Sequence, residues 1–332
     1  MRNVKEFRRG KPGFYPDQSI YAEFACAEFG LAFRDLDKGS GLIFSVASPE
    51  KSLHFGAGRC SWYPQNDATA STLASDKYFT GKILDAAGVP VIGGEYFFLH
   101  ERYRAHRPAG HERDDALVHF HGLGASAFVK PLTGSRGDFA QRIHGETALM
   151  RYLNEVAKYY DAILMQPIVE GIEWRIFLLD DDALFCARKH PPSVHGDGVR
   201  TLRELLTAHN DALRARGLSP VSPEDRDPSL DDVLAKDERR EIPGRMNLSA
   251  GGTMVIEPAP SEKAVALARQ ATRALGLRGA AVDMFVGIGR DPDAMIVIEV
   301  NSNPSIRLLE QSGRDDLILK IWHHTFSAMG LL

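Results

Sequence analysis

Two acidic residues and an asparagine near the end of the chain have the types and spacing of a metal site. Asp283 lies in the segment GAAVDMFVG, and Glu299 and Asn301 lie in MIVIEVNSNPSI. Both segments are apolar runs typical of buried strands, where an ionised carboxylate is costly unless a cation neutralises it. Residues two apart on a strand point to one face, and such oxygen donors suit Mg²⁺ beside phosphates. The alternative is that Asn-Ser-Asn-Pro only forms a turn at a strand end.

A glycine-containing loop after another predicted strand is a candidate anion site. The segment FVKPLTGSRGDF places Lys130 at the strand end, just before the loop. Glycines let backbone N–H groups approach a phosphate closely, and a lysine can neutralise its charge. The pattern is neither GxGxxG nor GxxxxGK[ST], so an ordinary solvated loop is the alternative. The loop residues that could contact phosphate are Gly134, Ser135, Arg136 and Gly137.

The segment LMQPIVEGIEWRIFLL is predicted to form two strands around a turn at residues 170–171. A nucleotide base could lie against the connecting segment Gln166, Pro167 and Ile168, with Glu173 placed to bond ribose hydroxyls. Arg175 is a charge on an otherwise apolar strand, so we expect it to face the same site. A hairpin with a charged end is the alternative interpretation.

Composition limits the class of protein. The 332 residues are 44% hydrophobic and 25% charged, which is typical of a globular protein with ample core. The net charge of −4 argues against general nucleic-acid binding. No segment has the pattern of a signal peptide or the length of a membrane helix. Three widely spaced cysteines fit reduced thiols, so we expect a cytoplasmic protein.

Periodicity predicts strands that alternate with helices, which indicates an α/β or α+β protein. Thr201 and Glu204 are predicted to form a capping box. Residues 218–244 are expected to be a loop or insertion. His119 and His121 are two residues apart, the spacing that would place both on one face of a strand as a metal pair, but no Cys or carboxylate companion is evident. The predicted helices cover residues 19–30, 81–88, 201–217 and 261–276, and the predicted strands cover 126–131, 162–169, 173–180, 183–189 and 253–257. One further helix is predicted to have Leu149, Met150, Leu153 and Val156 on one face.

Taken together, these motifs resemble the ATP-grasp superfamily over nearly the whole chain from about residue 17. The similarity is greatest to the ligase modules of cyanophycin synthetase and of the bifunctional bacterial glutathione synthetase. It is carried by FGAGR (55–59), ASDKYFTGKILDAAGVPV (74–91), FVKPLTGSRG (128–137), EGIEWRIFLL (170–179), HPPSVHGDGVRTLRELL (190–206), RMNLSAGGT (245–253) and IEVNSNPSI (298–306).

The resemblance implies an ATP-grasp fold, in which two α+β subdomains hold ATP after a small N-terminal region. The implied divisions are residues 1–74, 75–165 and 166–332. By resemblance, Lys77 and Lys130 contact ATP phosphates and residues 134–137 form the glycine-rich loop. Gln166 occupies the adenine-hinge position, where many relatives have Glu. The remaining implied roles are ribose binding by Glu173, magnesium binding by Asp283, Glu299 and Asn301, and catalysis by Arg175, Arg245 and Asn247.

The implied activity is ATP-dependent ligation of a carboxylate to an amine through an acyl phosphate. Implied cofactors are ATP and Mg²⁺, with two ions expected and Mn²⁺ as a substitute. Expected partners are small carboxylate and amine substrates, without nucleic acid or membrane, and a homodimer is compatible with the chain. The alternatives are a macrocyclase acting on a larger peptide and a non-catalytic nucleotide-binding regulator.

Overall fold

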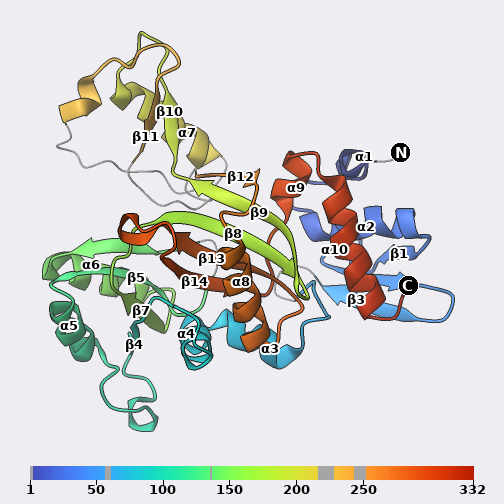
Figure 1. Ribbon diagram of the computed structural model, residues 1–332, viewed down its shortest axis with the longest axis horizontal. Helices are drawn as coiled ribbons and strands as arrows, with labels where there is room; N and C mark the ends of the chain where they lie inside the picture. Colours follow the sequence, from blue (N-terminus) through green and yellow to red (C-terminus); the bar gives the residue numbers. More distant parts are fainter. Residues whose placement is uncertain (1–2, 57–60, 135–136, 216–227, 243–251) are drawn as a thin grey trace.

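The computed structural model describes residues 3–56, 61–134, 137–215, 228–242 and 252–332. Within this part of the chain the strands form four sheets, and every pairing between neighbouring strands is antiparallel. Figure 1 shows a small unit at the N-terminus beside two larger sheets, with a lobe projecting above them. No helix in the described ranges is long and apolar enough to cross a membrane. The mixed α+β fold class is therefore confirmed.

The N-terminal and C-terminal segments of the chain pack together around one hydrophobic core. The C-terminal helices return to pack on α2, as Figure 1 shows at the right of the molecule. Tyr21, Phe44 and Trp322 are buried in their shared core. Gly30, at φ 70°, ends α2 in the left-handed conformation that favours glycine. The elements are α1 (Val4–Arg8), α2 (Asp17–Phe29), β1 (Ala32–Asp35), β2 (Ile43–Ala47), β3 (Ser52–Gly56), α9 (Arg307–Gln311) and α10 (Asp315–Ala328).

A four-stranded sheet in the order β4-β7-β5-β6 forms the second unit. The helices α5 and α6 share one hydrophobic core with it. Asp76 caps the N-terminus of a helix, α4 (Lys77–Ala86), and its side chain accepts hydrogen bonds from two backbone N–H groups of the first turn. The elements of this unit are β4 (Glu95–Phe98), η1 (Arg104–His106), α5 (Arg113–Gly122), β5 (Ser126–Pro131), β6 (Gln141–His144), α6 (Glu146–Val156) and β7 (Ala162–Gln166). The preceding helices α3 (Ala68–Ser75) and α4 (Lys77–Ala86) pack instead against the five-stranded sheet described next.

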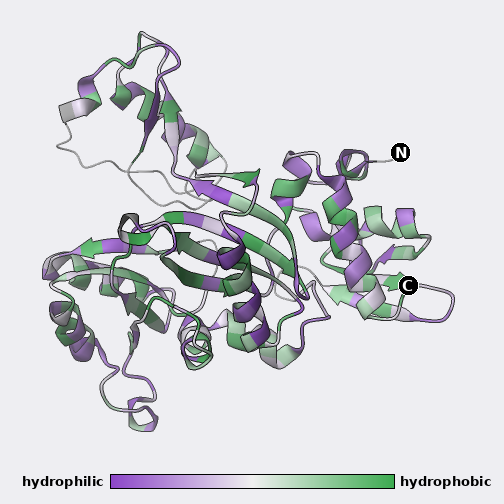
Figure 2. Ribbon diagram, viewed as in Figure 1, coloured by the Kyte–Doolittle hydropathy of each residue, from purple (hydrophilic) through white to green (hydrophobic). Residues whose placement is uncertain are grey.

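The third unit is a five-stranded sheet in the order β12-β9-β8-β13-β14. One face is apolar and packs against α8, with Ile176, Val282 and Val297 in the shared core. Figure 2 shows the hydrophilic residues of β9 gathered at its end, after an apolar run, as its sequence DALFCARKH has it. The elements are β8 (Ile172–Leu179), β9 (Asp182–His190), β12 (Thr253–Glu257), α8 (Glu262–Leu275), β13 (Gly279–Val286), η4 (Ile288–Arg290) and β14 (Met295–Asn301).

The projecting lobe has a small core of its own, formed by residues such as Leu205, Leu213 and Leu234. The predicted capping box is confirmed, because the Thr201 N–H donates to Glu204 Oε2 at 2.8 Å and the Glu204 N–H donates to Thr201 Oγ1 at 3.3 Å. The elements are β10 (Ser193–His195), α7 (Leu202–Ala215), η2 (Pro228–Asp231) and β11 (Arg239–Glu241).

Three local expectations were wrong. β7 and β8 join different sheets, so residues 164–179 cross between sheets and do not form a hairpin. His119 and His121 lie on α5, where residues two apart do not share a face, so strand spacing does not apply. In α6, Met150 is exposed, whereas Leu149 and Leu153 are buried.

Candidate active site

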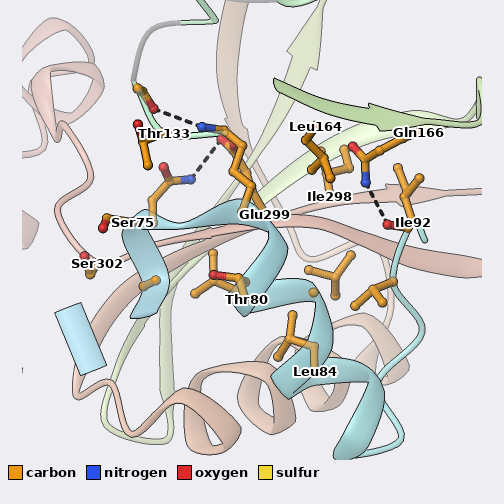
Figure 3. Close-up of a pocket in the computed structure, with 18 of the residues that line it drawn as sticks. Ser75, Thr80, Leu84, Ile92, Thr133, Leu164, Gln166, Ile298, Glu299 and Ser302 are labelled. Atoms are coloured by element: carbon orange, nitrogen blue, oxygen red, sulfur yellow. Dashed lines mark hydrogen bonds between the residues drawn. The ribbon is translucent and has the colours of Figure 1, made fainter. Parts of the chain in front are cut away.

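A cavity of about 340 Å³ lies between the two larger sheets, bounded by α4, β7, β14 and the loop after β5. Figure 3 shows side chains from these elements converging on it. One end is apolar and is lined by Leu84, Ile92, Leu164 and Ile298. The other end is polar and is lined by Ser75, Lys77, Thr133, Glu299, Asn301 and Ser302. A ligand with a flat apolar part and a charged part would match these two ends.

The register of β13 and β14 brings the predicted metal ligands together. Asp283 and Glu299 are direct cross-strand partners, and Asn301 lies two residues further along the same strand. A β-bulge interrupts the ladder next to Asp283, because Met284 pairs with Val297 and Ile298 is the extra residue. The bulge places Ile298 and Glu299 together on the wall of the cavity, although they are consecutive.

Buried charges on β8, β9 and β13 form one network. Arg175 donates to both oxygens of Asp283, at 2.7 Å each, and Lys189 donates to Asp283 Oδ2 at 2.9 Å and to Glu173. Burial alone would raise the pKa of Asp283, but Arg175 and Lys189 outweigh it and hold that pKa well below the usual range. Burial likewise opposes the charge of Lys189, yet Asp283 and Glu173 raise its pKa. Asp283, Arg175 and Lys189 are therefore held in their charged forms, whereas burial raises the pKa of Glu173 in spite of its contact with Lys189.

The residues predicted to bind magnesium suit a hard cation by their donor atoms. Glu299 has no cation within ion-pair distance among the described residues, and its Oε1 accepts from Asn301 Nδ2 at 3.2 Å. Asp283, which is fully buried, presents the second carboxylate directly across the ladder. No cluster of three His, Cys, Asp or Glu side chains suited to a metal occurs in the described ranges, so the candidate set depends on the Asn301 amide oxygen.

Two lysines face this carboxylate group from the opposite sheet and from α4. Lys130 is buried on β5, and burial lowers its pKa to about 8 despite the nearby charge of Glu299. Lys77 begins α4 and donates through Nζ to the Gly134 carbonyl at 3.1 Å (Figure 3). Burial also lowers the pKa of Lys77, again opposed by Glu299. Both lysines are thus held near negative charge without a bonded carboxylate among the described residues.

The predicted base-binding segment borders the apolar end of the cavity. The Gln166 side chain donates to the Ile92 carbonyl at 2.7 Å and lines the cavity (Figure 3). Pro167 is exposed and Ile168 is half-buried in the crossover between the sheets. A Cβ at Gly94 would lie 2.5 Å from the Met165 carbonyl, so the chain there passes β7 too closely for a larger residue.

Several predicted site residues are placed differently or are not described. Glu173 is paired with Lys189, and Arg175 is paired with Asp283 in the buried network. Gly137, at φ 66°, is described, whereas Ser135, Arg136, Arg245 and Asn247 lie outside the described residues.

Sequence reasoning missed Lys189. The signal was present, because β9 reads DALFCARKH and Lys189 has the strand parity of buried Ala187. Lys189 is two residues from Ala187, so its side chain lies on the same face of the sheet as those of Glu173 and Asp283.

Comparison with known proteins adds sequence relatives, although no family model matches. The chain is 26% identical over 210 residues to a glutathione biosynthesis bifunctional protein of Mannheimia succiniciproducens, covering 56% of this chain and 28% of that protein. It is 26% identical over 270 residues to cyanophycin synthetase of Synechocystis, covering 71% of this chain and 28% of that protein. The chain thus spans under a third of each of these relatives.

Solved structures share the fold. A bifunctional glutathione synthetase from Pasteurella multocida matches with a TM-score of 0.56 and 20% identity, covering 92% of this chain and 44% of that one. A D-alanine–D-alanine ligase from Bacillus anthracis matches with a TM-score of 0.51 and 14% identity, covering 79% of this chain and 69% of that one. The chain therefore has the fold of these two ligases.

Proposed function

We propose that this protein is an ATP-dependent carboxylate–amine ligase that joins amino acids, or a short peptide and an amino acid. The observation that carries the proposal is the cavity with an apolar end and a charged end, where Lys77 and Lys130 face Glu299. The sequence relatives are synthetases, which supports the same reaction class.

The two ends of the cavity suit the two parts of ATP. The adenine would lie at the apolar end near Gln166 and the segment 167–168, against Ile298 and Leu164. The phosphates would lie at the polar end, where Lys77 and Lys130 offer positive charge. Glu173 reaches the ribose in this proposal only if it leaves Lys189, because the two are bonded in the free protein.

Magnesium would be held by Glu299, Asp283 and the Asn301 oxygen, with two ions and Mn²⁺ as a substitute. When bound, Mg²⁺ supplies neutralising charge for the phosphate oxygens. Glu299 is the carboxylate of the set that is not bonded to a cation among the described residues. Lys189 and Arg175 fix the position of Asp283, and Lys189 could also turn toward a phosphate.

The reaction proceeds in two balanced steps. The carboxylate oxygen of the acid attacks the γ-phosphorus of ATP, and the bond to ADP breaks. The amine then attacks the acyl carbon, phosphate leaves, and the amine loses a proton. Arg245 and Asn247 are proposed from the sequence to stabilise charge on the transferring group. The proposed substrates are small molecules, and the proposed location is the cytoplasm.

The proposal is tested by supplying amino acids in pairs with Mg²⁺ and ATP, measuring ADP release, and identifying products by mass spectrometry. A ligated product formed in proportion to ADP supports it. ATP binding without ligation for any acid and amine would instead favour a nucleotide-binding regulator. The matched control is Lys130→Met, which removes the positive charge proposed to bind phosphate and keeps the side-chain length.

A further inference from the structure

A buried asparagine outside the cavity uses all of its hydrogen-bonding capacity on the two strands that carry the proposed metal ligands. Asn66 Oδ1 accepts from the N–H groups of Arg278 at 2.8 Å and Gly279 at 2.9 Å. Its Nδ2 donates to the carbonyls of Gly279 at 2.7 Å and Ser302 at 3.1 Å. An amide side chain offers two acceptor and two donor positions, so this side chain is fully satisfied by backbone.

These four bonds lie where the β13–β14 ladder ends. Ala281 and Asn301 form the last residue pair of that ladder. Beyond it, one Asn66 nitrogen joins Gly279, the first residue of β13, to Ser302, which follows Asn301 directly. The side chain therefore takes the place of the next rung of the ladder. Unsupported strand ends open more readily than paired strand interiors, so this bridge acts on the residue pair that includes Asn301.

The segment 62–66 also holds the next two residues of the chain after Ser302. The Trp62 N–H donates to Asn303 Oδ1 at 3.2 Å, and the Tyr63 hydroxyl donates to the Pro304 carbonyl at 3.4 Å. The packing is close, because a Cβ at Gly279 would lie 3.1 Å from Gln65 Nε2. Residues 302, 303 and 304 are thus each bonded to a different residue of 62–66.

We propose that Asn66 is a positioning residue for the metal site, and that Trp62, Tyr63 and Asn66 form a clamp that fixes the end of β14. The inference rests on the proposed function, because it assigns the metal to Asp283, Glu299 and Asn301. Asn66 itself touches none of the reacting groups. It acts through Ser302 on Asn301, whose side chain must turn its oxygen toward the ion instead of donating to Glu299.

The chain offers a matched pair of variants. Asn66→Asp keeps an oxygen for the Arg278 and Gly279 N–H groups but replaces the nitrogen that donates to Ser302, so two oxygens would face each other. Gln65→Glu makes the same chemical change at the neighbouring buried residue. The Gln65 side chain donates to Thr325 Oγ1 at 3.1 Å on α10, and in the described structure it makes no hydrogen bond to residues 299–304.

Two measurements test the clamp. Hydrogen–deuterium exchange reports the strand end without any ligand, and electron paramagnetic resonance of free Mn²⁺ in the presence of ADP reports metal affinity. We expect Asn66→Asp to exchange faster at the amides of residues 299–303 and to raise the Kd for Mn²⁺ about 10–100-fold, the range for residues that orient metal ligands. Gln65→Glu should change neither, even where it lowers the unfolding midpoint by a similar amount.

The inference is overturned if amide exchange at residues 299–303 is the same in Asn66→Asp and wild type, or if both variants lose Mn²⁺ affinity equally. Should Asn66→Asp not fold, Tyr63→Phe removes the single bond to Pro304 and should accelerate exchange at 303–305 alone; unchanged exchange there overturns the clamp. Wild-type protein that fails to bind Mn²⁺ with ADP refutes the proposed metal site instead, since the exchange result stands without it.

Discussion

Replacing Lys130 by methionine should make the protein more stable and less able to bind nucleotide. The Lys130 side chain is buried, and burial lowers its pKa from 10.5 to about 8. At 1.36 kcal/mol per pKa unit, that difference corresponds to about 3 kcal/mol of unfavourable free energy for the charged form in the folded state. Methionine has a similar length and carries no charge, so Lys130→Met removes this cost.

The pH dependence gives the sign of the effect. Below about pH 8 the lysine is protonated in both the folded and the unfolded protein, so the full cost is present. Between about pH 8 and 10.5 only the unfolded state keeps the proton, and the wild type therefore becomes more stable as pH rises. Urea denaturation should show Lys130→Met more stable than wild type by up to about 3 kcal/mol at pH 7, with the gap closing near pH 10.5.

Nucleotide binding should follow the opposite trend. A phosphate beside Lys130 favours the charged amine, so binding takes up protons near pH 8 and wild-type affinity for ADP falls about tenfold from pH 7.5 to pH 9. Lys130→Arg stays charged and should remove most of this dependence, leaving only the contribution of Lys77, whose pKa is also lowered. Calorimetry in buffers of different ionisation enthalpy measures the uptake. A Lys130→Met protein less stable than wild type at pH 7, or wild-type affinity that is flat across this range, would refute the reasoning.

Substitutions at four further residues separate the roles within the site. Glu299→Gln should nearly abolish turnover and weaken Mg²⁺–ATP binding, whereas Asn301→Asp keeps an oxygen donor and should retain part of the activity; equal activities in steady-state assays would contradict the metal assignment. Asp283→Asn should lower the free energy of unfolding by about 3–5 kcal/mol at pH 7, because Arg175 and Lys189 lose their shared carboxylate, and equilibrium denaturation measures the loss. Its folded pKa is depressed, so this stabilisation is fully present above about pH 4 and is lost as pH falls further. Arg245→Ala should reduce turnover far more than ATP affinity, with Arg245→Lys as a partial rescue; equal losses in calorimetry and kinetics would make Arg245 an ordinary phosphate contact.

Much of the fold follows from local patterns. The strand at 126–131 and the helix closed by Gly30 were predicted correctly, because apolar periodicity and a left-handed cap are local signals. The metal candidates were found for the same reason, since a carboxylate on an apolar strand stands out without any knowledge of its neighbours. Their direct pairing across β13 and β14 then appears in the register.

The features that sequence reasoning missed depend on contacts between residues that lie far apart in the sequence. The sequence predicted that Arg175 faces the site, but it did not identify its partner Asp283, which lies 108 residues away. A buried charge shows that some partner exists, yet it does not show which one. The crossover at 167–171 was mistaken for a hairpin because two strands with a short connection look alike in either arrangement. The pairing of Asn66 with β13 and Ser302 carries no sequence pattern at all.

Because Ile298 is an extra residue in β14, the apolar end of the cavity can change in evolution without a change at the charged end. Removing Ile298 would restore regular pairing between Met284–Val297 and Asp283–Glu299, with Glu299 still on its present face. The charged end of the cavity would then stay unchanged, while the apolar end beside Gln166 would lose the Ile298 side chain. Relatives could therefore change the group they accept at that wall by insertion or deletion at one position, without altering the residues proposed for phosphate chemistry.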